Sequence, residues 1–350
     1  MKFVGCGGHS YRNVYPTFQY APIDLVAVCD FDLEKARAYA RQFGAKTAYS
    51  DYRDMLTKEN LDAVFVVTSY EREDGEPQST KIVLDVLEAG LHVWIEKPQS
   101  GKPDNIREMM ALSEQKNRYV FVGYKKAFSP AYVKAKELMD QDDFGSLTSC
   151  SVRYPESLPP LEKRRDGSRM RRFLDHYVHP ASILYALAGP IHSMRRLRDR
   201  RRGATITLID FVNGAIGAMH LTAGQSGMSP LERVELIGEG SNLVVDNGIY
   251  VTYYRPGKRG KYGRTAGFIP DEIDMAPLTW SPEFSLGQLY NKNIFTLGYA
   301  QEILYFCDCV LNQSPPEYCN LEMALEMAKI YQGFLCTDDE EIIINPRSPL

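Results

Sequence analysis

Short apolar runs alternate with helical patterns over the first third of the chain. Apolar runs lie at 2–6, 24–29, 61–68, 92–96 and 119–123, and helically spaced apolar residues separate them at 33–43, 80–89 and about 105–115. The run at 61–68 is almost continuously apolar, as is typical of a parallel strand covered on both faces. This rhythm predicts a doubly wound parallel sheet of the α/β class over residues 1–123.

The pattern changes after about residue 124. A helix is expected near 131–139, a strand near 147–154, a helix near 181–188, and alternating strands between 193 and 254. Asn-Gly pairs at 213–214 and 247–248 separate some of these strands, which is hairpin chemistry. Two late helices near 297–310 and 321–334 could pack back on the first domain. Residues 124–350 are therefore predicted to form an α+β domain with a large, mostly antiparallel, open sheet.

Composition narrows the class of protein. The 350 residues carry a formal charge of −4, 44% are hydrophobic, and no apolar run is long enough for a membrane span. No long apolar segment follows the first residues, so we expect a cytoplasmic protein without a secretory signal or membrane partner. The seven cysteines form no CxxC pair, which favours reduced thiols over disulfides or a metal site. An acidic chain without a known module is not expected to bind nucleic acid.

A glycine-rich turn follows the first predicted strand. In Gly5-Cys6-Gly7-Gly8-His9-Ser10, the first glycine permits a tight turn and Gly7 lets the backbone approach a pyrophosphate. Ser10 stands where the pattern has a small residue for close helix–strand packing, and Gly8 and His9 complete the turn. This context predicts a Rossmann dinucleotide site. A plain strand–turn–helix cluster is the alternative, and His9 could equally face solvent.

An acid ends the second predicted strand. Asp30 lies 20 residues beyond Ser10, a spacing that suits the ribose hydroxyls of an adenosine. The next residue is Phe31, with no cation to receive a 2′-phosphate, so NAD is favoured over NADP. Alternatively, Asp30 would only cap the following helix.

A lysine closes another apolar strand. In Glu96-Lys97-Pro98, the lysine stands at the carboxyl end of a parallel strand, where ligands of such sheets bind. Its ammonium could hydrogen-bond a substrate oxygen and stabilise developing alkoxide charge. The Lys97–Pro98 bond is a candidate for the cis form. A surface salt bridge with a loop proline is the alternative.

Asp175 and His179 are four residues apart, so on one helix they would share a face. A histidine there suits general acid/base work. Pro180 is disfavoured inside a helix, so we expect the helix to begin near Tyr177, with the pair straddling its start. Asp175 as a helix cap is the alternative reading, and His176 competes for the acid/base role.

These motifs together resemble the Gfo/Idh/MocA oxidoreductases (glucose–fructose oxidoreductase, inositol dehydrogenase). The resemblance rests on GxGGxS, the acid after the second strand, EAG-x-HV-x-x-EKP, VGYKKAFSPAY (122–132), NGAIGAMHLTA and Asp175-x-x-x-His179. It implies a Rossmann domain followed by an α/β domain whose open sheet often mediates oligomers, here a homodimer or homotetramer. It also implies NAD(P)-dependent oxidation or reduction of a sugar or cyclitol carbon.

The resemblance completes the candidate site. Lys97, His179 and Asp175 are the expected catalytic residues. The expected cofactor contacts are Gly5, Gly7, Gly8, His9, Ser10, Asp30, Phe31, Thr68, Ser69, Glu96 and Lys97. The expected substrate contacts are Lys97, Tyr124, Arg172, Asp175 and His179. In the implied reaction, His179 takes the hydroxyl proton while Lys97 holds the same oxygen and Asp175 binds a neighbouring hydroxyl.

The chain departs from the family pattern in two places. The segment 69–77 looks longer than usual, and 168–172 replaces a glycine-rich run with Ser-Arg-Met-Arg-Arg. Basic clusters also occur at 161–172, 195–202 and 255–264. They are ordinarily solvated loops, but an arginine of the first cluster could bind a carboxylate or phosphate of an anionic substrate.

Two other functions remain open from the sequence. The same fold could carry a redox-neutral enzyme that oxidises a sugar, permits elimination and regenerates a tightly held NAD. It could also be a non-catalytic NAD-binding sensor or scaffold, against which the presence of Lys97, Asp175 and His179 argues.

Overall fold

The computed structural model describes residues 1–59, 61–71, 75–256, 276–283 and 292–347. The chain divides into two compact units. The first holds Met1–Phe128, Leu161–Val178 and Asn291–Cys336, and the second holds Ser129–Pro160, His179–Tyr290 and Thr337–Leu350. The chain thus passes between the units more than once, whereas the sequence placed one boundary after residue 123.

The first unit is built on a six-stranded sheet in the order β3-β2-β1-β4-β5-β6, with every pair parallel. Its strands are β1 (Lys2–Val4), β2 (Ala27–Cys29), β3 (Thr47–Tyr49), β4 (Ala63–Val66), β5 (His92–Glu96) and β6 (Val120–Gly123). The predicted doubly wound sheet is confirmed. Strand order reverses between β1 and β4, and ligands of such sheets bind at the carboxyl ends of the strands at this switch point.

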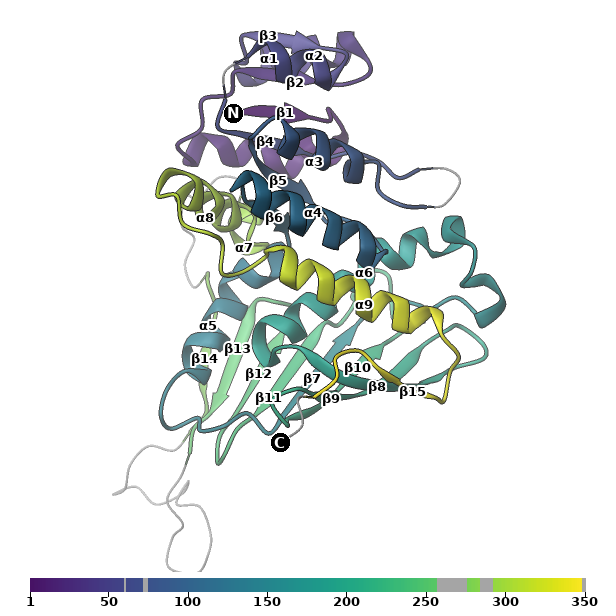
Figure 1. Cartoon of the computed structure of the whole chain (residues 1–350). Coiled ribbons are helices and arrows are strands. Elements are labelled where there is room, and N and C mark those ends of the chain that lie inside the picture. The colour runs from purple at the N-terminus through teal and green to yellow at the C-terminus, as the bar shows by residue number, and fades with distance from the viewer. Residues whose placement is uncertain (60, 72–74, 257–275, 284–291, 348–350) are drawn as a thin grey trace, which may run out of the picture. The chain divides into compact units, whose positions relative to one another are not determined.

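Helices cover both faces of this sheet (Figure 1). The helices of this unit include η1 (Ser10–Val14), η2 (Tyr15–Tyr20), α1 (Leu33–Phe43), α2 (Tyr52–Lys58), α3 (Ser79–Glu88), α4 (Pro103–Lys116), η3 (Lys125–Phe128), η4 (Leu161–Lys163), α7 (Lys292–Thr296), α8 (Tyr299–Leu311) and α9 (Leu321–Leu335). The late helices α8 and α9 pack on this first unit, and α9 runs beside α4.

One aromatic residue on each of four neighbouring strands builds the core of this unit. Phe3, Phe65, Trp94 and Phe121 are register partners on β1, β4, β5 and β6, and none of their side chains is exposed. The rings of Phe3 and Phe65 stack with their centroids 5.9 Å apart. The ring of Phe306 in α8 packs edge-on against Phe65, with the centroids 5.6 Å apart. Burying such rings removes their full apolar area from water, so this layer fixes the strand register.

The second unit is a nine-stranded sheet in the order β14-β13-β12-β11-β7-β10-β9-β8-β15. Its strands are β7 (Ser149–Tyr154), β8 (Ile191–Arg198), β9 (Thr205–Phe211), β10 (Ile216–Leu221), β11 (Arg233–Ile237), β12 (Asn242–Asp246), β13 (Tyr250–Tyr254), β14 (Leu278–Trp280) and β15 (Glu341–Ile343). The pair β7–β10 is parallel and the other pairs are antiparallel, which confirms the mostly antiparallel sheet.

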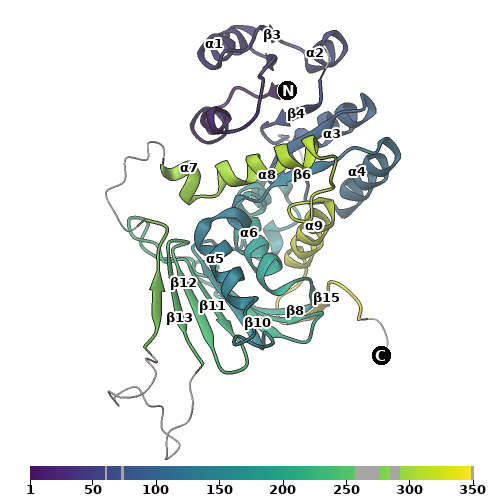
Figure 2. The ribbon, with the colours of Figure 1, turned by 90° about the vertical axis from the view of Figure 1, so that its left-hand side faces the viewer.

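The faces of this sheet differ in burial. Helix α5 (Pro130–Met139) packs on β12 and β13 (Figure 2). Along β9 the burial alternates, and Leu208 is 60% exposed. On the neighbouring strands, Leu197 of β8 and Ile216 of β10 are each 63% exposed. Oligomerisation through this face stays a prediction.

Helix α6 (Gly167–Ala188) corrects the expectation of a helix that begins near Tyr177, because it runs through Pro180 without a break. Proline in a helix interior costs about 3 kcal/mol. Phe173, Leu174 and Tyr177 before it and Leu184 after it are all buried. Each such side chain contributes roughly 1.5–3 kcal/mol on burial, so packing outweighs the lost backbone hydrogen bond.

Three other expectations concern composition. All seven cysteines, which lie within the described residues, are free thiols, and only Cys336 of them is exposed. Within the described residues, no helix combines the length and apolar character needed to cross a membrane. The basic cluster 255–264 lies outside the described residues except for its first two positions.

Candidate active site

The glycine turn is held tightly against the neighbouring strand. Gly5 has φ +108°, a left-handed conformation that favours glycine, and a Cβ there would lie 1.7 Å from the carbonyl oxygen of Val67. The Ser10 hydroxyl donates to the Gly5 carbonyl at 2.9 Å. A Cβ at Gly7 or Gly8 would meet no atom within 4 Å, so this side of the turn is open. The turn therefore presents bare backbone to a ligand.

Asp30 connects the turn to the end of β2. Its Oδ2 accepts a 2.7 Å hydrogen bond from the Cys6 backbone N–H, and its Oδ1 accepts one from Asp32 at 3.1 Å. The cap of α1 is Asp32 and not Asp30, because the Asp32 side chain accepts from the first-turn amides. Asp30 is 7% exposed, whereas Phe31 is 89% exposed.

A pocket of about 550 Å³ opens along this turn. Predicted cofactor contacts that line it are Gly5, Gly7, Gly8, His9, Ser10, Asp30, Phe31, Thr68 and Ser69. Thr68 carries a buried hydroxyl without a hydrogen-bond partner among the described residues. A dinucleotide fits this lining, because the open glycines admit a pyrophosphate and both Asp30 and Thr68 can bond a ligand hydroxyl.

The pocket residues that sequence reasoning missed include Lys35, Tyr52 and Gln78. Lys35 lies in the first turn of α1, close in sequence to Asp30, so its position was open to prediction. Tyr52 and Gln78 follow β3 and β4 at the same edge of the sheet. Glu96 and Lys97 are not among the residues that line this pocket.

Lys97 follows β5, next to β4 in the sheet, and the Lys97–Pro98 peptide bond is cis. Its side chain is 10% exposed, and its Nζ donates to Asp175 Oδ1 at 2.7 Å and to the Asp175 carbonyl at 3.1 Å. Glu96 Oε1 lies 4.0 Å from the same nitrogen. The structure thus brings together two residues that the sequence placed 78 positions apart.

Asp175 also accepts from Tyr70, which the sequence did not single out. The Tyr70 hydroxyl donates to Asp175 Oδ1 at 2.7 Å. Burial tends to raise the pKa of Asp175, but the charge and hydrogen bond of Lys97 and the Tyr70 hydrogen bond together hold it below its ordinary value. Asp175 is therefore an ionised partner for Lys97 near neutral pH.

A second group of ionisable residues lies near the Glu96 carboxylate. His9 Nε2 is 3.4 Å from Glu96 Oε2, and Lys125 Nζ donates to the Tyr299 hydroxyl at 2.8 Å. Burial lowers the pKa of Lys125 to about 8, although the Glu96 charge opposes this. Burial also raises the pKa of Glu302, which has no side-chain exposure, and the nearby Glu96 charge adds to the shift. Because these residues lie far apart in the chain, no local sequence pattern predicts that they lie close together.

The other predicted residues have varied surroundings. His179 lies on α6 one turn beyond Asp175, and its ring is 6.1 Å from that of Tyr154. Arg172 is an exposed residue of the same helix. Tyr124 is only 1% exposed and its hydroxyl donates to Gln99 at 2.5 Å, which argues against direct substrate contact. His176 Nε2 lies 3.6 Å from Asp175 Oδ2.

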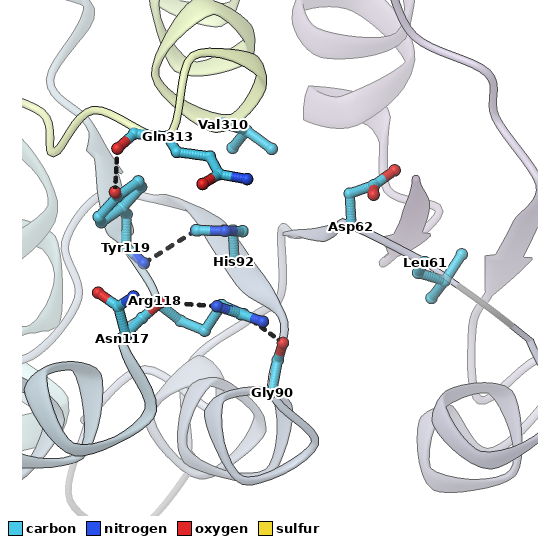
Figure 3. A pocket seen from close by; sticks show the side chains of 9 residues that line it. All are labelled: Leu61, Asp62, Gly90, His92, Asn117, Arg118, Tyr119, Val310 and Gln313. Carbon is cyan, nitrogen blue, oxygen red and sulfur yellow. Dashed lines mark hydrogen bonds between the residues drawn. The ribbon is translucent and has the colours of Figure 1, made fainter.

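A smaller pocket of about 230 Å³ lies at the opposite, amino ends of β4, β5 and β6 (Figure 3). His92 Nδ1 accepts from the Tyr119 backbone at 3.0 Å, and Arg118 Nε donates to the Gly90 carbonyl at 2.5 Å. Burial, followed by the Arg118 charge, lowers the pKa of His92 to about 4. None of the predicted site residues lines this pocket.

Known proteins resemble the chain in its first domain and in its whole fold. Residues 1–124 match the GFO_IDH_MocA family, an oxidoreductase family with an NAD-binding Rossmann fold. An uncharacterized oxidoreductase, YrbE, of Bacillus subtilis (strain 168) is 23% identical over 89% of this chain and 87% of its own length. Myo-inositol 2-dehydrogenase of Thermotoga maritima is 22% identical over 64% of this chain and 68% of its own.

A solved structure extends the likeness of fold. Levoglucosan dehydrogenase, in complex with NADH and levoglucosan, superposes with a TM-score of 0.77 at 16% identity and covers 98% of each chain. At this identity the superposition shows the fold alone. The match of residues 1–124, the glycine turn at the switch point and the strand order agree. Residues 1–124 thus carry the NAD-binding Rossmann domain of the Gfo/Idh/MocA family of oxidoreductases.

Proposed function

We propose that this protein transfers a hydride between NAD and a secondary hydroxyl or ketone of a sugar, cyclitol or related polyol. The observation that carries the proposal is the ion pair of Lys97 with Asp175, at the same strand ends as the glycine-turn pocket. The names of two relatives, which act on myo-inositol and levoglucosan, support the substrate class.

Lys97 is proposed to hold the reacting oxygen. Asp175 occupies two of its N–H donors, which leaves the third for a substrate oxygen. An ammonium held in this way stabilises the alkoxide charge that develops as the hydroxyl is oxidised. Bound NAD would supply the hydride acceptor, and the chain supplies orientation and charge.

His179 is proposed as the acid/base and Asp175 as the ligand of a neighbouring hydroxyl. Support comes from the continuous helix α6, on which residues four apart share a face. Arg172, on the same helix, is proposed to favour substrates that carry an anionic group. Tyr124 is left out because of its burial.

NAD is proposed as the cofactor in preference to NADP. Asp30 in the pocket is an acceptor for ribose hydroxyls and would repel a 2′-phosphate. Lys35, which lines the same pocket, would weaken that preference. Comparing the dissociation constants of the two cofactors decides between them.

The test is Lys97→Met, assayed by NADH absorbance on a panel of sugars, cyclitols and uronates. Turnover should fall on the order of 100- to 1000-fold, because alkoxide stabilisation is lost, while NAD affinity changes less than about threefold. Lys116→Met, which removes a half-buried lysine paired with Glu88 in the same unit, is the matched control. Undiminished turnover in Lys97→Met contradicts the proposed mechanism.

The panel also separates the proposal from its rivals. Tightly held NAD and an altered sugar without net NADH would indicate the redox-neutral reaction. NAD binding without change in any compound of the panel would favour a sensor or scaffold.

A further inference from the structure

The segment between β4 and α3 carries a side chain into the candidate site. Tyr70 is 105 residues from Asp175 in the chain, yet its hydroxyl lies 2.7 Å from Asp175 Oδ1. This segment is the one that looks longer than usual for the family.

The base of the segment is closed by backbone pairing. The backbone N–H of Gln78 donates to the Ser69 carbonyl at 3.0 Å, and the backbone N–H of Glu71 donates to the Glu76 carbonyl at 2.7 Å. An antiparallel bridge joins Tyr70 to Pro77 between them. These backbone hydrogen bonds therefore fix the position of the Tyr70 backbone.

Two contacts anchor the segment to the rest of the first unit. Glu76 Oε2 accepts from the Ser100 hydroxyl at 2.6 Å and from the Gly101 amide at 3.1 Å, just after Lys97 and Pro98. Gly75, at φ +74°, packs so closely on Gly167 that an added Cβ would lie 2.3 Å from its carbonyl oxygen. The segment thus contacts both the loop that follows Lys97 and the start of α6, which carries Asp175.

The two carboxylate oxygens of Asp175 have different surroundings. Oδ1 accepts from both Lys97 Nζ and the Tyr70 hydroxyl, each at 2.7 Å. Oδ2 has His176 Nε2 at 3.6 Å, beyond hydrogen-bond length, and accepts no hydrogen bond from another described residue. The Asp175 side chain is 32% exposed, so a ligand can reach it.

We propose that Tyr70 is a positioning residue, which commits Oδ1 of Asp175 to Lys97 and leaves Oδ2 to accept a single substrate hydroxyl. The inference rests on the proposed function and deepens it. Without the tyrosine hydroxyl, the carboxylate could rotate about its Cβ–Cγ bond and exchange its oxygens, and Lys97 would lose its fixed orientation.

The charges around the carboxylate define a pH readout. Lys97 from the end of β5 and His176 from α6 act on the Asp175 carboxylate, and the charges of Glu96 and Arg171 act on the Tyr70 hydroxyl that it accepts from. Burial, then the Asp175 charge, raises the pKa of Tyr70, so its hydroxyl stays a donor at neutral pH. Its hydrogen bond lowers the pKa of Asp175, and removing the hydroxyl should therefore raise that pKa.

The decisive variant is Tyr70→Phe in the full-length protein with NAD. We expect the Asp175 titration, followed by NMR of ¹³C-labelled aspartate carboxyls and assigned with Asp175→Asn, to move to higher pH. With any compound of the panel that the wild type oxidises, kcat should fall on the order of tenfold. The acidic limb of its pH profile should move in the same direction, with NAD affinity changed less than about threefold.

Two further variants make the result specific. Tyr253→Phe removes a hydroxyl that donates to Asp143 at 3.0 Å in the second unit, and should alter neither the Asp175 titration nor the kinetics. Glu76→Gln weakens the anchor and should shift the titration as Tyr70→Phe does, but less.

An unchanged Asp175 titration in a folded Tyr70→Phe protein overturns the inference, as does a titration shift with unchanged kcat and pH profile. If no compound of the panel is oxidised, the proposed function has failed. The NMR titration then still decides whether Tyr70 holds Asp175.

Discussion

The glycine turn shapes its pocket with backbone atoms, whereas Lys97 and Asp175 hold each other through side-chain charges. At the turn, the Gly5 backbone lies against Val67 and leaves no room for a side chain. At the pair, two oppositely charged groups meet at 2.7 Å. The first region should therefore be sensitive to any added Cβ, and the second to any lost charge.

The largest effect is expected from Gly5→Ala. The new Cβ would lie 1.7 Å from the Val67 carbonyl and would need a left-handed backbone, so β1 and β4 must shift apart. We expect a loss on the order of 3–5 kcal/mol in unfolding free energy, together with loss of NAD binding. Urea unfolding and a cofactor titration measure the two effects. Near-native stability would show that the turn adapts more readily than its geometry suggests.

Asp175→Asn tests the charged region. Its amide can still accept a hydrogen bond, but Lys97 loses its counter-charge, so turnover should fall on the order of 100-fold. NAD affinity should change less than about threefold, because the glycine-turn pocket does not include Asp175. Asp54→Asn, which breaks an exposed pair with Lys58, is the control. If the variant loses NAD binding as strongly as turnover, the two regions are not independent.

The smallest effect is expected from Gly7→Ala. Because a Cβ there meets no atom within 4 Å, the unfolding free energy should change by less than about 0.5 kcal/mol. NAD should nevertheless bind about tenfold more weakly, since the methyl occupies the space for the pyrophosphate. Calorimetric titration of NAD, with thermal unfolding alongside, measures both. Unchanged NAD affinity would argue that the pyrophosphate does not rest on this turn.

The two regions also differ in how far sequence could predict them. The turn and Asp30 belong to one local pattern of strand, glycine and acid, so the sequence placed them together. Lys97 and Asp175 were each identified, but the contact between them, and the Tyr70 contact above all, depends on chain segments that only the fold brings together. Contacts between residues far apart in the chain leave no periodic pattern or fixed spacing in the sequence from which they could be predicted.

Parts of the fold were missed for equally physical reasons. Strand β3 has three residues of intermediate burial, and so lacks the apolar run that marks a strand. The continuous α6 was missed because Pro180 is a strong local signal against a helix, whereas the packing of Phe173 and Leu184 is a tertiary effect. The sequence indicated only as one possibility that α8 and α9 pack on the first unit.

The aromatic layer of the first unit has a practical consequence. The chain has two tryptophans, and Trp94 is fully enclosed by the parallel sheet, whereas Trp280 belongs to β14 of the second unit. Each half of the molecule therefore carries its own fluorescent reporter. Replacing one indole at a time would let the melting of each half be recorded separately in a single intact chain.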